Sequence, residues 1–205
     1  MSTSPIGSAV AAVGPVEGPN AVPPHNDDQV LRYMRAKLYQ HVSQRVTVDG
    51  PTGHAFEYLV EPDGRQHRIV LMNRATLGRG GPFAFVGFFG RKRPDADSVV
   101  LDELDRELVA EFIDHPQLLS YSSLELADGS WANLVVMSSP EAAMHWGNSA
   151  RHAYAVREVA PRCYLTIRLH SGVIIAGERS IDLLHIKRTK YFDFEQSSRG
   201  AFSYE

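Results

Sequence analysis

The order of secondary-structure signals over residues 83–172 constrains the fold more than any other feature of this sequence. It begins with FAFVGFF at residues 83–89, a continuous apolar run that is typical of a buried strand. A helix is predicted next, because apolar side chains recur every fourth residue until Pro116 stops the pattern. These apolar positions are Val100, Leu104, Leu108 and Phe112. The acidic residues Asp102, Glu103, Asp105 and Glu107 are expected on the solvated side of this helix.

Two further strands, a second helix and a last strand complete the pattern. LLSYSSLEL and WANLVVM flank the turn ADGS at residues 127–130, which predicts a hairpin. Ser138 and Glu141 have the spacing of a capping box, and Pro161 ends the helix that they begin. YLTIRLHSG then forms the final strand. The order β-α-β-β-α-β predicts a ferredoxin-like α+β fold, in which both helices cover one face of a four-stranded antiparallel sheet.

The chain divides into four segments. Residues 1–27 are rich in Ser, Gly, Pro and Ala without an apolar period, so we expect a disordered tail. Residues 28–80 predict a helix and then a β-meander whose first strand lies around Val46. The ferredoxin-like domain is expected over residues 81–175. Residues 176–205 predict a C-terminal arm or extra strand, whose aromatic side chains suit packing on a second subunit.

Composition excludes several classes of function. The net charge of -3 over 205 residues argues against a nucleic-acid or anionic-membrane partner, since such proteins concentrate Lys and Arg. The single cysteine excludes an internal disulfide bond and a cysteine-rich zinc site. The sequence contains neither an apolar run long enough for a membrane span nor a signal peptide, so we expect a cytoplasmic protein.

The segment WANLVVMSSPEAAMHWGNSARH resembles the antibiotic-biosynthesis-monooxygenase type of dimeric α+β barrel. That family has a strand ending in Trp-x-Ser, then Glu-Ala, then Trp, and a His near the middle of the second helix. The corresponding residues here are Ser139, Glu141, Ala142, Trp146 and His152, with Met137 where the strand-end Trp is common. The resemblance implies a homodimer in which two sheets pack face to face, with a cavity inside the barrel or between each sheet and its own helices.

A homodimer is also expected on physical grounds, because a single sheet with helices on one face leaves its other face uncovered. The resemblance does not fix the reaction. Members of the superfamily include cofactor-free oxygenases of aromatic polyketides, polyketide cyclases, haem-degrading enzymes and haem-containing dehydratases, so function has to be inferred from the site.

The last predicted strand has one apolar and one polar face. Alternation places Tyr164, Thr166, Arg168 and His170 on the polar side. If this face is covered, Arg168 needs an anion, which is either an anionic group of a substrate or a carboxylate such as Glu125. The remaining alternative is a face that is open to water.

The second helix carries two histidines. His145 and His152 are two turns apart and are expected on the same side, next to Trp146. They lie about 10 Å apart along the helix axis, which is too far to chelate one metal ion. His152 is therefore a structural residue, a general base or, as the resemblance implies, an axial ligand of haem. Gly147-Asn148 predicts a kink or a close approach in mid-helix.

Two classes of function follow. The first is a small-molecule enzyme of secondary metabolism or catabolism: a cofactor-free monooxygenase, cyclase or dehydratase acting on an aromatic or polyketide-like substrate. Its variant is a haem-binding enzyme with His152 as the metal ligand. The second class is a non-enzymatic dimeric binding module. The expected catalytic residues are His152, His170 and Arg168, and the expected substrate-binding residues are Tyr164, Thr166, Trp146 and His145.

Overall fold

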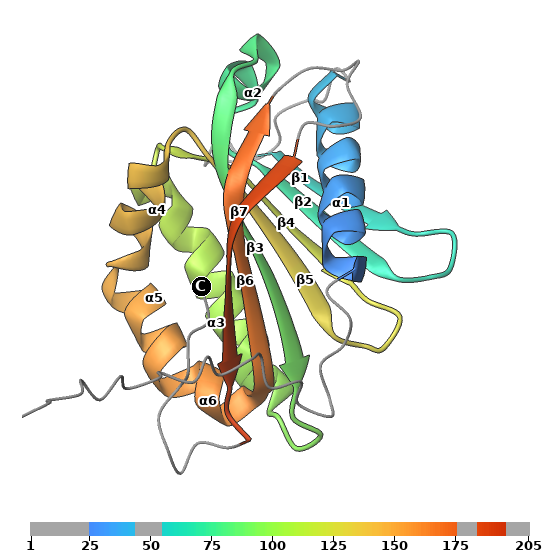
Figure 1. Cartoon of the computed structure of the whole chain (residues 1–205), viewed down its shortest axis with the longest axis vertical. Coiled ribbons are helices and arrows are strands. Elements are labelled where there is room, and N and C mark those ends of the chain that lie inside the picture. Colours follow the sequence, from blue (N-terminus) through green and yellow to red (C-terminus); the bar gives the residue numbers. More distant parts are fainter. Residues whose placement is uncertain (1–24, 44–54, 176–183, 196–205) are drawn as a thin grey trace, which may run out of the picture.

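The protein has three layers in the computed structural model, which describes residues 25–43, 55–175 and 184–195 (Figure 1). A seven-stranded sheet forms the middle layer of this described part. The helix α1 (His25–Ser43) covers one face of the sheet, and α3 (Ser98–Glu111) lies with α4, α5 and α6 over the other face.

The strands are β1 (Ala55–Val60), β2 (Gln66–Leu71), β3 (Pro82–Lys92), β4 (Leu118–Glu125), β5 (Trp131–Met137), β6 (Tyr164–Ile175) and β7 (Leu184–Asp193). The other helical segments are α2 (Arg74–Arg79), a 3-10 turn (Phe112–Asp114), α4 (Pro140–Gly147), α5 (Ala150–Tyr154), a π-helical turn (Ala155–Val159) and α6 (Ala160–Cys163). Across the described ranges, no helix combines the length and the apolar character that crossing a membrane requires.

Every neighbouring pair of strands is antiparallel, in the order β1-β2-β4-β5-β3-β6-β7. The inner four strands, β4-β5-β3-β6, come from the segment in which the sequence predicts β-α-β-β-α-β. The helices that connect them lie on one face, as that pattern requires (Figure 1). The α+β class is therefore confirmed, and the strand order is compatible with a ferredoxin-like fold.

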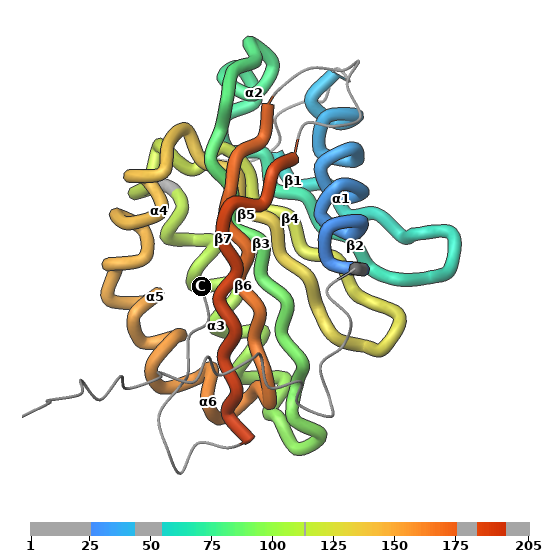
Figure 2. The backbone as a smooth tube through the Cα atoms, in the orientation of Figure 1, coloured from blue at the N-terminus to red at the C-terminus, as the bar shows by residue number. Residues whose placement is uncertain are grey.

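The outer strands extend the sheet at both edges. The β1–β2 hairpin adds to β4, and β7 runs beside β6 along most of its length (Figure 2). The predicted meander is thus present as far as the described residues reach, whereas its first strand, around Val46, lies outside them. Within the C-terminal segment 176–205, residues 184–193 form an extra strand of the same sheet.

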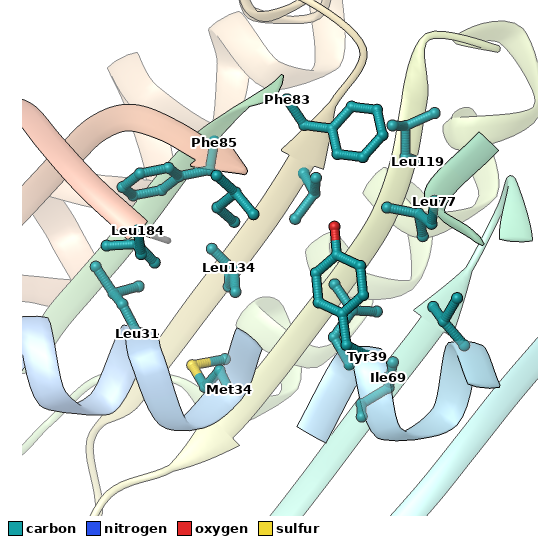
Figure 3. Packing of buried hydrophobic residues seen from close by; sticks show 14 of the residues in the cluster. Leu31, Met34, Tyr39, Ile69, Leu77, Phe83, Phe85, Leu119, Leu134 and Leu184 are labelled. Carbon is teal, nitrogen blue, oxygen red and sulfur yellow. The ribbon is translucent and has the colours of Figure 1, made fainter. Parts of the chain in front are cut away.

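The main hydrophobic core lies between α1 and the sheet. Leu31, Met34 and Leu38 project from one side of α1 and have no exposed surface. Figure 3 shows Leu31 and Met34 directed toward Leu134 of the sheet. Gly87 allows this close approach, because a Cβ atom at that position would lie 2.7 Å from Cδ2 of Leu31.

The position of α1 changes the basis of the homodimer prediction. The sequence predicts that this face of the sheet meets a second subunit, but α1 of the same chain covers it (Figure 1). An uncovered apolar face is therefore not a reason for dimerisation here. Whether two chains associate through another surface stays a prediction.

The predicted boundary of the N-terminal tail is wrong at its C-terminal end. Residues 25–27 were assigned to the tail but form the first turn of α1, and Asp27 is only 3% exposed. The reason is that Asp27 has partners far along the chain, which local composition does not reveal. Residues 1–24 lie outside the described residues.

Truncating the core of α1 should destabilise the protein. Met34→Ala removes a fully buried side chain and is expected to lower the free energy of unfolding by about 2–5 kcal/mol. Gln40→Ala on the exposed side of the same helix is the control, with an expected change within about 0.5 kcal/mol. Urea unfolding measures both variants. Equal stabilities would contradict the packing of α1 on the sheet.

Candidate functional site

The face of the sheet opposite α1 contains a cavity of about 370 Å³, which lies beneath α3 and the α4–α6 segments. A second lobe of about 290 Å³ adjoins it toward β2 and shares part of its lining. The space exists because α3 stands away from the sheet. None of its side chains is buried, and its apolar residues Leu104 and Leu108 face the cavity. This volume lies within the range of small-molecule sites.

Apolar side chains from β3, β5, β6 and β7, from α3, α4 and α6, and from the π-helical turn line the larger lobe. Val86 and Phe88 come from β3, and Leu169 comes from β6. Phe192 and Phe194 close the edge near β7, with ring centroids 6.4 Å apart in a stacked arrangement. These two aromatic residues were expected to pack on a second subunit, but they line the cavity of their own chain.

A partly buried polar cluster lies where the two lobes meet. Asp105 of α3 accepts hydrogen bonds from Arg68 of β2, at 2.7 and 2.9 Å, and from the Tyr121 hydroxyl at 3.0 Å. The Arg68 guanidinium also lies over the Tyr121 ring, 5.4 Å from its centroid. Burial and the Asp105 charge raise the pKa of Tyr121 well above its usual value. Asp105 is thus a paired carboxylate and Tyr121 a neutral phenol.

Tyr164 lines both lobes because β6 contains a bulge. Thr166 pairs with Arg91, but Tyr164 pairs with Lys92, so Leu165 is an extra residue that turns Tyr164 to the helix side of the sheet. The prediction that Tyr164 shares a face with Thr166 is therefore wrong. Burial raises the pKa of the Tyr164 phenol well above its usual value, so its hydroxyl is a hydrogen-bond donor at neutral pH.

His152 and Trp146 line the larger lobe side by side. Helix α4 ends at Gly147, where the sequence predicts a kink, and Ser149 begins α5 by accepting a hydrogen bond from the His152 backbone N–H at 3.1 Å. This break brings the two side chains together, with ring centroids 4.8 Å apart. Phe112 also packs against Trp146, in an edge-to-face contact.

His152 is uncharged at neutral pH. Burial lowers its pKa, and a hydrogen bond to the backbone carbonyl of Gly147 opposes this effect only in part. One ring nitrogen therefore carries a proton that it donates to Gly147. Nδ1 is buried and has no hydrogen-bond partner among the described residues.

His145 does not join this site. Its side chain is exposed, and the expectation that it projects beside His152 is wrong. The seven-residue spacing places two side chains on one side only in a continuous helix, whereas α4 ends between them.

Arg168 and His170 lie on the opposite side of the sheet, beneath the N-terminal end of α1. Arg168 donates to both carboxylate oxygens of Asp27, at 2.6 and 2.9 Å, and His170 Nε2 lies 2.9 Å from the same carboxylate. Thr166 is buried on this side and hydrogen bonds to Tyr191. The structural ion pair foreseen for Arg168 is present, but with Asp27 instead of Glu125.

The expected catalytic and substrate-binding residues thus occupy two separate places. His152, Trp146 and Tyr164 meet at the cavity, whereas Arg168 and His170 are bound to α1. A catalytic role of Arg168 as the receptor of an anionic substrate does not agree with this geometry, because its charge is already compensated by a buried carboxylate.

Sequence reasoning missed three polar residues of the cavity. Asp105 was assigned to the solvated side of the first helix, and Tyr121 and Asn133 were not singled out within their strands. A signal was present for the strand residues. In the hairpin register Tyr121 pairs with Val135, and Asn133 is two residues from Val135. Tyr121 and Asn133 therefore lie on the same face of the sheet, the one beneath α3.

Comparison with known proteins does not assign a family. No protein-family model matches the sequence, and no curated protein matches it. The resemblance to the antibiotic-biosynthesis-monooxygenase type of barrel therefore stays a prediction.

Breaking the ion pair beneath α1 should destabilise the fold. Arg168→Leu leaves the Asp27 carboxylate, whose side chain is 5% exposed, without its bidentate partner, and we expect a loss of about 3–5 kcal/mol in unfolding free energy. Adding Asp27→Asn should restore part of this loss. Arg162→Leu, in an exposed pair with Glu158, is the control and should cost less than about 1 kcal/mol. Retained stability in Arg168→Leu would refute the structural role.

The same cluster predicts a pH dependence of stability. Burial raises the pKa of Asp27, but the hydrogen bonds and charges of His170 and Arg168 outweigh it, so the pKa lies below 3.8. A lowered carboxyl pKa contributes stability above the unfolded value, and this contribution is lost as the pH falls through the folded value. The stability advantage of the wild type over Asp27→Asn should therefore be larger at about pH 6 than at about pH 3. A constant difference in urea titrations would contradict it.

Proposed function

We propose that this protein binds a small, uncharged, largely apolar ring compound in the cavity beneath α3 and moves a proton on it without a cofactor. The observation that carries the proposal is the cavity itself. It is lined mainly by aliphatic and aromatic side chains, with Asn133, His152 and Tyr164 as its polar groups beside the Asp105 cluster. Binding sites for small organic molecules have this composition.

The charges around the cavity support an uncharged ligand. Asp105 is the one charged side chain in the described lining of the larger lobe, and Arg68 compensates it. An anionic group placed there would lie beside a carboxylate, and a cationic group would compete with Arg68. An anionic substrate group was one of the alternatives that the sequence left open as the partner of Arg168, and this proposal does not include it.

The polar residues suit proton transfer. His152 is neutral because burial lowers its pKa, so one of its ring nitrogens is unprotonated and can accept a proton from the ligand. Tyr164 keeps its phenolic proton and can donate a hydrogen bond, which would stabilise an oxygen that gains negative charge. Cyclisation, dehydration and cofactor-free oxygenation all include such a proton transfer. Binding without turnover is the alternative, and product formation distinguishes the two.

Haem does not fit this arrangement as well as a smaller ring compound does. His152 Nδ1 is buried, and this nitrogen is bonded to Cγ, so it lies nearer to the residue's own backbone than Nε2 does. The Trp146 ring also packs against the imidazole. We therefore include no haem in the proposed function.

Filling the cavity should abolish binding. Naphthalene is a suitable probe, and a ligand present at about a hundred times its Kd adds about 2.7 kcal/mol of stability. Leu104→Trp places a large ring in the cavity and should remove the naphthalene-induced increase in melting temperature. Glu103→Trp adds the same ring on the exposed side of α3 and should leave the increase unchanged.

Thermal unfolding with and without naphthalene measures both variants. An unchanged response of Leu104→Trp, or no response of the wild type to naphthalene, 2-methoxynaphthalene and 2-naphthol, would contradict the proposed site. An intense Soret absorption band of the purified protein would contradict a cofactor-free site.

A further inference from the structure

Two buried polar atoms at one corner of the cavity lack a partner within the described part of the chain: Trp146 Nε1 and His152 Nδ1. Both residues line the larger lobe, and Trp146 is only 8% exposed. Buried N–H groups and unprotonated ring nitrogens are nearly always hydrogen bonded, because water no longer compensates them. Two such atoms on neighbouring rings therefore indicate a group that binds between them.

The two atoms have opposite character. The indole Nε1–H of Trp146 can only donate a hydrogen bond. His152 is neutral because burial lowers its pKa, and in the tautomer that carries the ring proton on Nε2 its Nδ1 accepts a hydrogen bond. With ring centroids 4.8 Å apart, one small group can contact both rings.

We infer that this corner, formed by Trp146 and His152, binds a hydroxyl group of the ligand. A hydroxyl oxygen accepts from the indole N–H, while its own proton is donated to the imidazole Nδ1. An ether or a ketone can accept but has no proton to donate, an ammonium group cannot accept, and a carboxylate has no proton for Nδ1. The substrate class is thus a hydroxylated ring compound, a phenol or an alcohol.

This inference rests on the proposed function, since it requires a ligand in the cavity. It adds the functional group that the ligand carries and the place where that group binds. The proton that His152 would accept is then the proton of this hydroxyl group. Trp146 acts as a hydrogen-bond donor and not only as an aromatic wall.

Three probes of similar size test the inference: 2-naphthol, its methyl ether 2-methoxynaphthalene, and naphthalene. Isothermal titration calorimetry of the wild type at neutral pH, where 2-naphthol is uncharged, should give a Kd for 2-naphthol at least about tenfold lower than for either other probe. This comparison needs no variant, so it holds even if a substitution affects folding.

Variants then locate the preference. Trp146→Phe keeps an aromatic ring but removes the N–H, and His152→Phe removes the acceptor. Each should reduce the preference for 2-naphthol to within about threefold while leaving naphthalene binding nearly unchanged. Trp131→Phe and His145→Phe are the matched controls, because Trp131 lines the other lobe and His145 is exposed. Both controls should keep the full preference.

The outcomes separate the two proposals. If all three probes bind the wild type with equal affinity, the cavity binds ring compounds but the hydroxyl site is refuted. If the preference exists but survives in Trp146→Phe and His152→Phe, the hydroxyl group binds elsewhere and the assignment is also overturned. If none of the probes binds, both the hydroxyl site and the proposed function fail.

Discussion

The burial of α1 against one face of the sheet is the constraint on which the rest of the structure depends. An apolar ridge through Leu31, Met34 and Leu38 forms the centre of this contact. A polar cluster fixes the N-terminal end of the helix, because Asp27 binds Arg168 and His170. Such contacts add orientation to a hydrophobic contact that has little directionality of its own.

A second polar cluster fixes α1 to the β1–β2 hairpin. The Tyr33 hydroxyl donates to Glu61, which also lies 2.8 Å from Nδ1 of the buried His67. Burial and the Glu61 carboxylate raise the pKa of Tyr33 to about 12, so it remains a donor. α1 thus fills the apolar centre of this face, and a polar pocket of about 510 Å³ lined by Asp27, Arg91 and Arg168 remains at the N-terminal end of the helix. The apolar cavity lies on the other face, where α3 stands off the sheet and a broken helix brings Trp146 and His152 together.

Much of this architecture could be predicted from local patterns, whereas the pairing of distant polar residues could not. Apolar periodicity and turn residues predicted the elements from β3 to β6, because each depends on neighbours within a few residues. The partner of Arg168 lies 141 residues away in α1, and no local pattern connects the two. The apolar period of α1 predicts that the helix packs on other elements, but it does not predict the face of the sheet on which the helix packs.

The errors at the candidate site have equally physical causes. Alternation along β6 predicted the face of Arg168 and His170 correctly, but the bulge at Leu165 reversed the face of Tyr164. Helical periodicity paired His145 with His152, although α4 ends at Gly147. Asp105 was taken for a surface residue because an isolated helix gives no sign of the arginine that faces it on β2.

The central claim is that α1 fills the apolar centre of one face of the sheet and that the ligand binds in the apolar cavity on the other face. Methyl NMR spectra recorded during a naphthalene titration test it most directly, since each face carries its own methyl groups. The account predicts shift changes at Val135, Ile167 and Leu169, which line the cavity, and none at Leu31, Leu134 and Ile174 beneath α1. Changes confined to the methyl groups beneath α1 would contradict it.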